Sequence, residues 1–211
     1  MGLEVEARFR ADPASLHRLA TLPRLGEALL GEPATVDEVD RYLDTDDGRL
    51  AAARWACRLR TRGPMTKISL KGPPQPTDGD AWLHRRAEVE GPATDALDPA
   101  TWPPSEARDR LDDLRRGRPL LERFRLVQRR TERAVALDGD VLGTLTLDAV
   151  SVLSADGRPA GGIEIAELEL RAADARSEAA LRPLAAALAA EGLAPEPRTK
   201  LELAIDLLGS A

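Results

Sequence analysis

The sequence predicts an α+β fold, in which helices surround a mainly antiparallel β-sheet of about eight strands. About eight segments alternate apolar and polar residues, which is the period of a strand with two unlike faces. Short turns such as Gly63-Pro64 and Asp156-Gly157 join several of these segments and favour antiparallel neighbours. The 211 residues show no linker and no long internal repeat, so we expect one domain over residues 1–211.

The first half of the chain opens with the clearest strand. In residues 3–9, apolar side chains fall on one side of the extended chain, and Glu4, Glu6 and Arg8 fall on the other. Asp12-Pro13 is typical of an N-cap and first helical position, and it predicts a short helix. We then expect a turn up to residue 30, strands over residues 35–43, 54–62, 66–71 and 81–90, and an ambiguous segment at residues 50–53.

The second half alternates helices and long strands. Ser105 is placed to cap a helix that continues to residue 115. Residues 122–137 predict a long strand with a bulge, because the pair Arg129-Arg130 interrupts the alternation. We also expect strands over residues 142–153 and 162–171, an Ala-rich helix over residues 174–190, and a last helix over residues 200–208.

Composition bounds the classes of protein that this chain can be. The net charge of -6 argues against sequence-specific nucleic-acid binding, although a local basic site stays open. No apolar run reaches the length of a membrane span, and Glu4 and Glu6 stand where a signal peptide would be basic and then apolar. With Cys57 as its single cysteine, the chain fits a reducing compartment, so we expect a cytoplasmic protein without a membrane partner. The oligomeric state is open, with a homodimer as one option.

Lysine is rare in this chain, which uses arginine for nearly all of its 30 basic residues. Lysine is a compact charge whose pKa can shift, whereas arginine is a rigid and permanently charged fork. Each of the three lysines is therefore a candidate for a site at which arginine would not serve. These are Lys67, Lys71 and Lys200.

The charged strand faces sort by sign along the chain. One interpretation is that these faces are exposed to solvent, and the other is that they form a charged interior wall. The sorting by sign favours the interior wall, because solvent-exposed faces usually mix both signs. If the sheet closes with these faces inward, acids oppose bases across a wet lumen that magnesium and a polyanion with several phosphates would neutralise. The acids are Glu4, Glu6, Asp148, Glu167 and Glu169, and the bases are Arg58, Arg60, Lys67 and Lys71.

Seven short motifs, in order along nearly the whole chain, resemble those of the CYTH superfamily, the triphosphate tunnel metalloenzymes. The first, Glu4-Val5-Glu6-Ala7-Arg8-Phe9, resembles the ExExK signature of that family. The others are Tyr42-Leu43-Asp44-Thr45 with Leu50 and Arg58-Leu59-Arg60, then Ser69-Leu70-Lys71-Gly72-Pro73, Arg86-Ala87-Glu88-Val89-Glu90, Leu147-Asp148, Glu167-Leu168-Glu169-Leu170 and Thr199-Lys200.

The resemblance implies an eight-stranded antiparallel β-barrel that forms a tunnel with a polar, charged lumen and is flanked by helices. Family members hydrolyse inorganic triphosphate or thiamine triphosphate, cap RNA or cyclise ATP, with Mg²⁺ or Mn²⁺. The resemblance also implies roles for individual residues. Metal would be held by Glu4, Glu6, Asp148, Glu167 and Glu169. Phosphates would be held by Arg58, Arg60, Lys71, Arg86 and Lys200, with one or two of Arg125, Arg129 and Arg130. Glu88 and Glu90 would pair with bases or orient water.

Two departures from the family pattern bear on catalysis, for which we expect Glu4, Glu6, Arg8, Lys67 and Lys71. Arg8 replaces the signature lysine, which keeps the charge but not the ability to exchange a proton at neutral pH. Lys67 is additional on its strand and could supply the missing ammonium. We expect a structural role for His84 rather than a ligand role, because no second metal-ligating partner accompanies it.

The favoured hypothesis is a Mg²⁺- or Mn²⁺-dependent triphosphatase that acts on a linear triphosphate, inorganic triphosphate first. One alternative is an adenylate cyclase on the same scaffold, and another is a thiamine triphosphatase. A further alternative is a module that binds polyphosphate or nucleotide without turnover.

Overall fold

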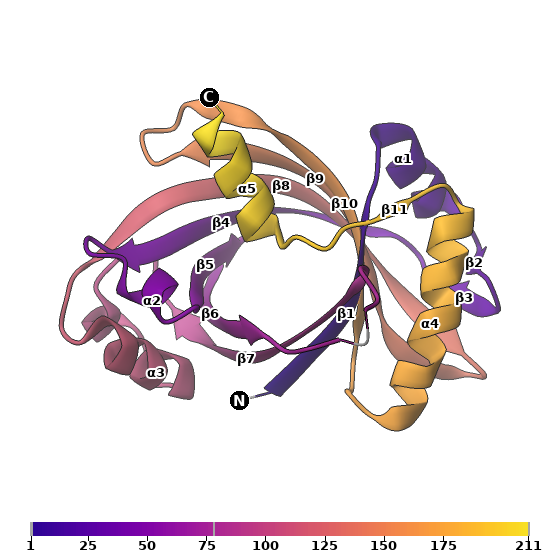
Figure 1. The fold of residues 1–211 in the computed structure, drawn as a ribbon, viewed down its shortest axis with the longest axis horizontal. Coiled ribbons are helices and arrows are strands. Elements are labelled where there is room, and N and C mark those ends of the chain that lie inside the picture. The colour runs from indigo at the N-terminus through magenta and orange to yellow at the C-terminus, as the bar shows by residue number, and fades with distance from the viewer. Residues whose placement is uncertain (1, 78, 211) are drawn as a thin grey trace.

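The computed structural model describes residues 2–77 and 79–210, and within them eight strands close into an antiparallel barrel (Figure 1). These strands are β1 (Gly2–Arg10), β4 (Ala34–Thr45), β5 (Ala56–Arg62), β6 (Met65–Pro74), β7 (Leu83–Ala93), β8 (Leu120–Leu137), β9 (Asp140–Ser154) and β10 (Pro159–Leu170). The order around the ring is β8-β4-β5-β6-β7-β1-β10-β9, and β9 pairs back with β8. The predicted α+β fold and the antiparallel barrel are confirmed.

Further short strands and the helices lie outside this ring. β2 (Arg24–Leu25) and β3 (Ala28–Leu30) form a hairpin beside β8, and β11 (Ala194–Pro195) pairs with β1. The sequence predicted a turn in place of the β2–β3 hairpin, because such short strands show no period. The helices of the described chain are α1 (Pro13–Thr21), α2 (Arg49–Ala52), α3 (Glu106–Arg115), α4 (Ala175–Ala190) and α5 (Lys200–Gly209), with a 3-10 turn, η1 (Pro99–Thr101). None of these helices is long and apolar enough to cross a membrane.

Side-chain caps explain where several helices begin. Asp12 accepts a hydrogen bond from Ser15 N at 2.7 Å, as the Asp-Pro motif predicted for α1. Thr199 and Glu202 form a reciprocal capping box at the start of α5. Asp44 accepts backbone N–H groups at the start of α2, which resolves the ambiguous segment 50–53 as a helix.

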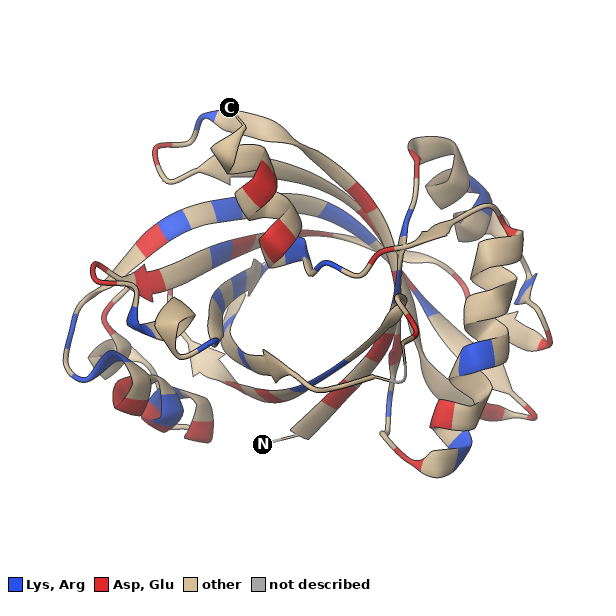
Figure 2. Cartoon of the chain, in the orientation of Figure 1, with Lys and Arg blue, Asp and Glu red and all other residues tan. Residues whose placement is uncertain are grey.

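Most of the hydrophobic core lies outside the barrel wall, between the strands and the helices. α1 and α4 cover the outer faces of β1, β9 and β10, where Val5 and Leu168 are buried. α3 covers the outer faces of β5, β6 and β7, where Leu59 and Ile68 are buried. Each such side chain stabilises the fold by about 1.5–3 kcal/mol on burial. Because the apolar residues face outward, the alternating charged residues face the lumen. Figure 2 shows where charged residues lie along the barrel strands.

α5 lies against the barrel and packs onto an apolar part of its interior. Leu203 and Ala204 are buried against Val152 and Ile165, whose side chains follow the inward positions of β9 and β10. The first residue of α5, Lys200, consequently lies at the charged part of the lumen. The C-terminal helix thus contributes a base that the strand pattern could not supply.

Candidate active site in the barrel lumen

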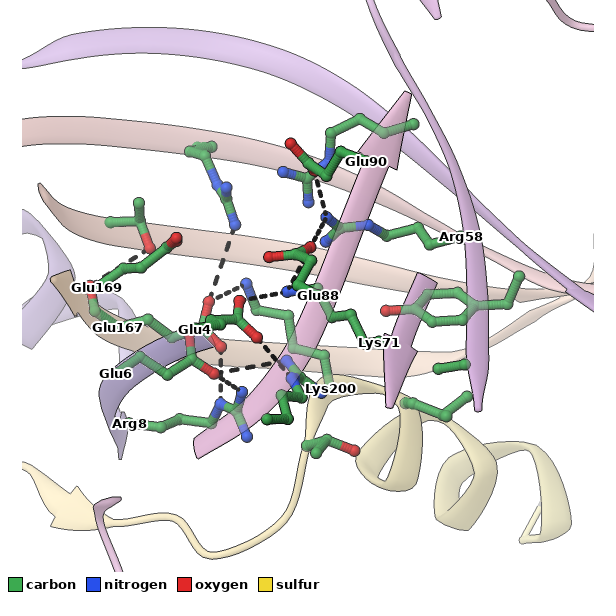
Figure 3. A pocket seen from close by; sticks show the side chains of 18 of the residues that line it. Glu4, Glu6, Arg8, Arg58, Lys71, Glu88, Glu90, Glu167, Glu169 and Lys200 are labelled. Carbon is green, nitrogen blue, oxygen red and sulfur yellow. Dashed lines mark hydrogen bonds and ion pairs between the residues drawn. The ribbon is translucent and has the colours of Figure 1, made fainter. Parts of the chain in front are cut away.

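A cavity of about 130 Å³ lies inside the barrel and is lined mainly by ionised side chains (Figure 3). Among the described residues, eight basic and six acidic side chains line it. They come from every second position of the barrel strands and from the start of α5. They are Glu4, Glu6, Arg8, Arg58, Arg60, Lys67, Lys71, Arg86, Glu88, Glu90, Arg130, Glu167, Glu169 and Lys200.

Glu4 lies on the acidic wall that β1 and β10 form. Arg86 Nε donates a hydrogen bond to Glu4 Oε2 at 2.6 Å, and Lys71 contacts the other carboxylate oxygen. Burial raises the pKa of Glu4, but the charges of Lys71 and Arg86 outweigh it and lower the pKa to about 2. Glu4 is therefore ionised at neutral pH before any ligand binds.

Arg8 lies fully buried between two carboxylates, with 1% of its surface exposed. Its Nε donates to Glu167 Oε1 at 2.7 Å, and its Nη2 donates to Glu6. Although burial lowers the pKa of Arg8, Glu6 and Glu167 raise it above its ordinary value. Burial raises the pKa of Glu6 and opposes the lowering of the pKa of Glu167 by Lys200 and Arg8. Arg8 is thus a fixed cation that cannot exchange a proton at neutral pH.

Asp148 is fully buried and is held by two cations. Arg130 donates to both carboxylate oxygens, each at 2.8 Å, and Lys200 Nζ also contacts Oδ2. Burial works against ionisation, yet Lys200 and Arg130 lower the pKa of Asp148 below its usual value. Lys200 Nζ also donates to Glu167 Oε2 at 2.6 Å. This arrangement is the geometry of a structural ion-pair network.

A second buried network was missed by the sequence analysis. Arg60 Nε and Nη2 donate to the two oxygens of Asp40, both at 2.7 Å. Gln128 Nε2 donates to Asp40 at 2.9 Å and to Glu38 at 3.1 Å. Glu38 and Asp40 lie two residues apart in a predicted strand, and this spacing, which puts both on one face, is the signal that would have found them.

Arg58 keeps an unused hydrogen-bond donor beside the cavity. Its Nη2 donates to Ser69 Oγ at 3.1 Å, and its Nη1 lies 3.6 Å from Asp40. Its Nε is buried and has no hydrogen-bond partner in the described part of the chain. A buried donor of this kind normally has a partner. The Arg58 side chain lines the cavity, and guanidinium groups bind phosphate through several N–H groups at once.

Three carboxylates converge on one point of the cavity wall and form the best-placed metal group in the described chain. One oxygen from each of Glu4, Glu88 and Glu169 lies within 4.8 Å of the others. Glu169 makes no ion pair with any residue in the ranges 2–77 and 79–210. Burial and the charges of Glu4 and Glu6 raise the pKa of Glu169 to about 7. Carboxylate oxygens are hard donors of the kind that Mg²⁺ or Mn²⁺ binds, and in this group Glu4 and Glu88 already have basic partners whereas Glu169 has none in the described chain.

The sequence-predicted metal ligands therefore divide into two groups. The structure brings Glu4 and Glu169 together with Glu88, which was expected only to support the site. Glu6, Asp148 and Glu167 lie against the cations described above. Metal binding by these three stays a prediction, and the geometry favours Glu88 in their place.

The expected phosphate-binding arginines of β8 also divide. Arg130 faces the lumen, whereas Arg129 is exposed and Arg125 donates to Glu122 at 2.6 Å on the outer side. Burial alternates without interruption from residue 124 to residue 130, so the prediction of a bulge at Arg129-Arg130 was wrong. The register between β8 and its neighbours shifts elsewhere, at Tyr42/Leu43 of β4 and at Val135/Ala136 of β8. Arg125 and Arg129 are therefore not placed to bind a ligand in the lumen.

Lys67 and Glu90 lie at the rim of the cavity. Lys67 Nζ donates to Glu90 Oε2 at 2.8 Å, and 46% of the lysine side chain is exposed. Glu88 lies 3.3 Å from Lys71 Nζ, so both acids of β7 lie beside bases. Lys67 is thus too far toward solvent to take the position of the signature lysine, which Arg8 occupies within the wall.

The cavity adjoins two larger hollows at opposite ends of the strands. Along β6, residues 65–67 line one hollow and residues 71–74 approach the other. The first, the hairpin vestibule, has a volume of about 780 Å³ and includes Arg62, Lys67 and Arg171. The second, the α5 vestibule, has a volume of about 790 Å³ and a more apolar lining, which includes Trp55, Leu201 and Ile205.

The barrel lumen thus combines a carboxylate cluster with eight bases among the described residues. The sequence profile of the CYTH domain matches residues 2–193. The chain belongs to the CYTH family. This CYTH domain has no match among curated proteins.

Three solved structures share the CYTH fold of this chain. One is a candidate adenylyl cyclase from Hippeastrum, described as having a dominant triphosphatase activity, with 18% identity, a TM-score of 0.67 and coverage of 96% of this chain and 95% of that one. Another, a candidate adenylate cyclase from Bacillus halodurans, has 22% identity, a TM-score of 0.61 and coverage of 96% and 98%. A Pyrococcus horikoshii protein has 18% identity, a TM-score of 0.59 and coverage of 96% and 98%.

Proposed function

We propose that this CYTH domain is a Mg²⁺- or Mn²⁺-dependent triphosphatase that hydrolyses a linear triphosphate, with inorganic triphosphate as the first candidate. One observation carries the proposal. The carboxylates of Glu4, Glu88 and Glu169 converge without enough positive charge beside Glu169, within the same cavity as eight bases. A bound metal cation would offset the charge of the carboxylates, and a bound polyphosphate would offset the charge of the bases. The Hippeastrum protein, described as having a dominant triphosphatase activity, supports the proposed triphosphatase function.

The bases would bind the phosphate chain by exchanging partners. Lys71 and Arg86 both contact Glu4, and each contact pairs a base of the cavity with an acid. Phosphate oxygens can replace the carboxylate at both bases, and the released carboxylate can then bind a cation. Arg58, which lines the same cavity and makes only a 3.6 Å contact with Asp40 through Nη1, would also bind phosphate. Ligand and metal binding are therefore expected to be mutually dependent.

Hydrolysis requires that a water oxygen bonds to the terminal phosphorus while the bridging P–O bond breaks, which yields phosphate and pyrophosphate. A metal at Glu4, Glu88 and Glu169 supplies Lewis-acid stabilisation and lowers the pKa of water when it is bound. Lys71 and Arg86 line the same cavity and would neutralise the charge that develops on the leaving pyrophosphate. The closed barrel holds these charges in fixed positions before the reaction begins.

The test is a turnover screen with purified protein, Mg²⁺ or Mn²⁺, and inorganic triphosphate, ATP or thiamine triphosphate. We expect metal-dependent phosphate release that is fastest with inorganic triphosphate. The Arg58→Met variant should lose at least tenfold in kcat/KM, whereas Arg129→Gln, on the outer face, serves as the control. Tight binding without release from any triphosphate would instead favour a non-catalytic binding module.

An organic triphosphate is the second candidate substrate, because the α5 vestibule is apolar and adjoins the phosphate cavity. Leu201 lines both the lumen cavity and the α5 vestibule, and Ile205, of which 53% is exposed, lines the α5 vestibule. If an organic group binds there, Ile205→Ser should lower kcat/KM for ATP or thiamine triphosphate but not for inorganic triphosphate. Formation of cyclic AMP from ATP would identify the cyclase alternative.

We also keep a cytoplasmic location and a homodimer as proposals. Cys57 is buried, and burial raises the pKa of its thiol, so it is poorly placed for disulfide exchange. Fractionation of cells and the solution mass of the purified protein test the two proposals directly.

A further inference from the structure

The segment over residues 194–199, here called the strap, connects α4 to α5 and runs across the barrel (Figure 1). Its first two residues pair with the end of β1. Its last residue, Thr199, lines the cavity, and Lys200 follows directly. The path of the strap therefore sets where the amine of Lys200 lies.

Two residues of the barrel wall, Arg8 and His84, hold the strap at three of its backbone atoms. Arg8 O accepts from Glu196 N at 3.0 Å, and Arg8 Nη1 donates to Arg198 O at 3.0 Å. His84 Nε2 lies 2.9 Å from Glu196 O. The two wall residues also contact each other, with 3.2 Å between Arg8 Nη1 and His84 Nδ1.

The contacts of His84 fix its tautomer. A guanidinium can only donate, so His84 Nδ1 accepts from Arg8 and the ring proton sits on Nε2. Nε2–H then donates to Glu196 O. Burial and the charge of Arg8 lower the pKa of His84 to about 4, so the neutral ring that this geometry requires is the form present at neutral pH.

Arg8 joins the strap to the acidic wall because its donors point in several directions. Nε and Nη2 contact Glu167 and Glu6 in the wall, while Nη1 contacts the strap and His84. A single ammonium at this position could not span these partners. The arginine that replaces the signature lysine is therefore matched to the histidine beside it.

We infer that Arg8 and His84 form a clamp that positions the strap and thereby Lys200. Both are positioning residues: Arg8 holds Glu6 and Glu167 in place, and His84 orients Arg8 and the strap. The clamp stands on contacts within the chain, and only its effect on turnover rests on the proposed function. Lys200 Nζ lies 2.6 Å from Glu167 Oε2. Arg8 therefore acts on this lumen pair in two ways, because it contacts Glu167 directly and holds the strap that leads to Lys200.

The test compares His84→Leu, which removes the acceptor, with His84→Asn, whose amide oxygen can accept from Arg8 in place of Nδ1. Hydrogen–deuterium exchange over residues 194–209 reports on the strap without any turnover. We expect His84→Leu to speed exchange there at least tenfold and to raise KM for triphosphate about tenfold, with kcat within threefold. His84→Asn should stay within threefold of the unchanged protein in KM.

A second variant keeps the proposal falsifiable through the other half of the clamp. Arg8→Lys should speed strap exchange as His84→Leu does, and the double variant should add less than threefold to either single effect. If His84→Leu does not fold, Arg8→Lys compared with His84→Asn gives the same test.

Strap exchange and KM unchanged in both His84→Leu and Arg8→Lys would overturn the clamp, as would equal losses in His84→Leu and His84→Asn. Faster strap exchange in a protein that hydrolyses no triphosphate would support the clamp and overturn the proposed function. The two proposals therefore fail in distinguishable ways.

Discussion

Two acidic clusters share the lumen, and their surroundings differ sharply. Asp148 and Glu167 have their oxygens against Arg130, Lys200 and Arg8, and these cations lower both pKa values against the effect of burial. Glu169 lies among other carboxylates, and burial with the nearby charges raises its pKa to about 7. Carboxylates of one barrel thus differ in their surroundings, because Asp148 and Glu167 are each paired with cations, whereas Glu169 has no ion-pair partner in the described chain.

The largest expected effect is on stability in the cluster of Asp148 and Glu167. Asp148→Asn removes the buried carboxylate to which Arg130 donates twice and which shares Lys200 with Glu167, and breaking a buried pair in this way costs about 3–5 kcal/mol of unfolding free energy. Denaturant unfolding measures the change. Asp140→Asn, on the same strand but in an exposed pair, is the control and should change the free energy by less than about 0.5 kcal/mol. A small loss in Asp148→Asn would remove the contrast between the clusters.

In the cluster around Glu169, the expected effect is on metal affinity. Glu169→Gln removes one of the converging carboxylates, and we expect the affinity for Mn²⁺ to fall at least tenfold, or about 1.4 kcal/mol. Calorimetric titration at pH 8 measures it. Glu167→Gln serves as the comparison. If Glu167→Gln weakens Mn²⁺ binding as much as Glu169→Gln does, Glu167 is a metal ligand, as the sequence predicted, and the group of Glu4, Glu88 and Glu169 is incomplete.

The raised pKa of Glu169 also predicts a pH dependence with a definite sign. Between about pH 4.5 and 7 the folded protein holds a proton that the unfolded chain has lost, so this group's contribution to stability declines as pH rises through that window. Mn²⁺ competes with the same proton, so its affinity should rise by up to tenfold per unit below pH 7 and level off above it. Glu169→Gln should abolish the rise. A flat affinity between pH 5.5 and 7 in the unchanged protein would contradict the assignment.

The smallest expected effect lies on the outer face. Arg129→Gln should change the free energy of unfolding by less than about 0.5 kcal/mol and leave triphosphate turnover unchanged, because Arg129 is exposed. Its neighbour Arg130 faces the lumen, so Arg130→Gln should reduce turnover at least tenfold. Equal effects of the two substitutions would mean that the assigned register of β8 is wrong.

The lumen could be predicted from the sequence because its residues repeat with period two. Glu4 and Glu6, or Arg58 and Arg60, fall on one face wherever the strands pair, so their inward direction needed only the closure of the sheet. Their pairing could not be predicted, because it depends on which strands meet around the ring. Lys200 reaches Asp148 from a helix 52 residues along the chain, and no local pattern records that contact.

The apolar layer outside the wall has a consequence for how such a protein can change. Here Leu59 and Ile68 are packed behind the strands, and rim residues such as Lys67 and Glu90 face away from them. Substitutions of rim side chains can therefore change which ligand the barrel binds, while the packing behind the strands keeps the fold unchanged.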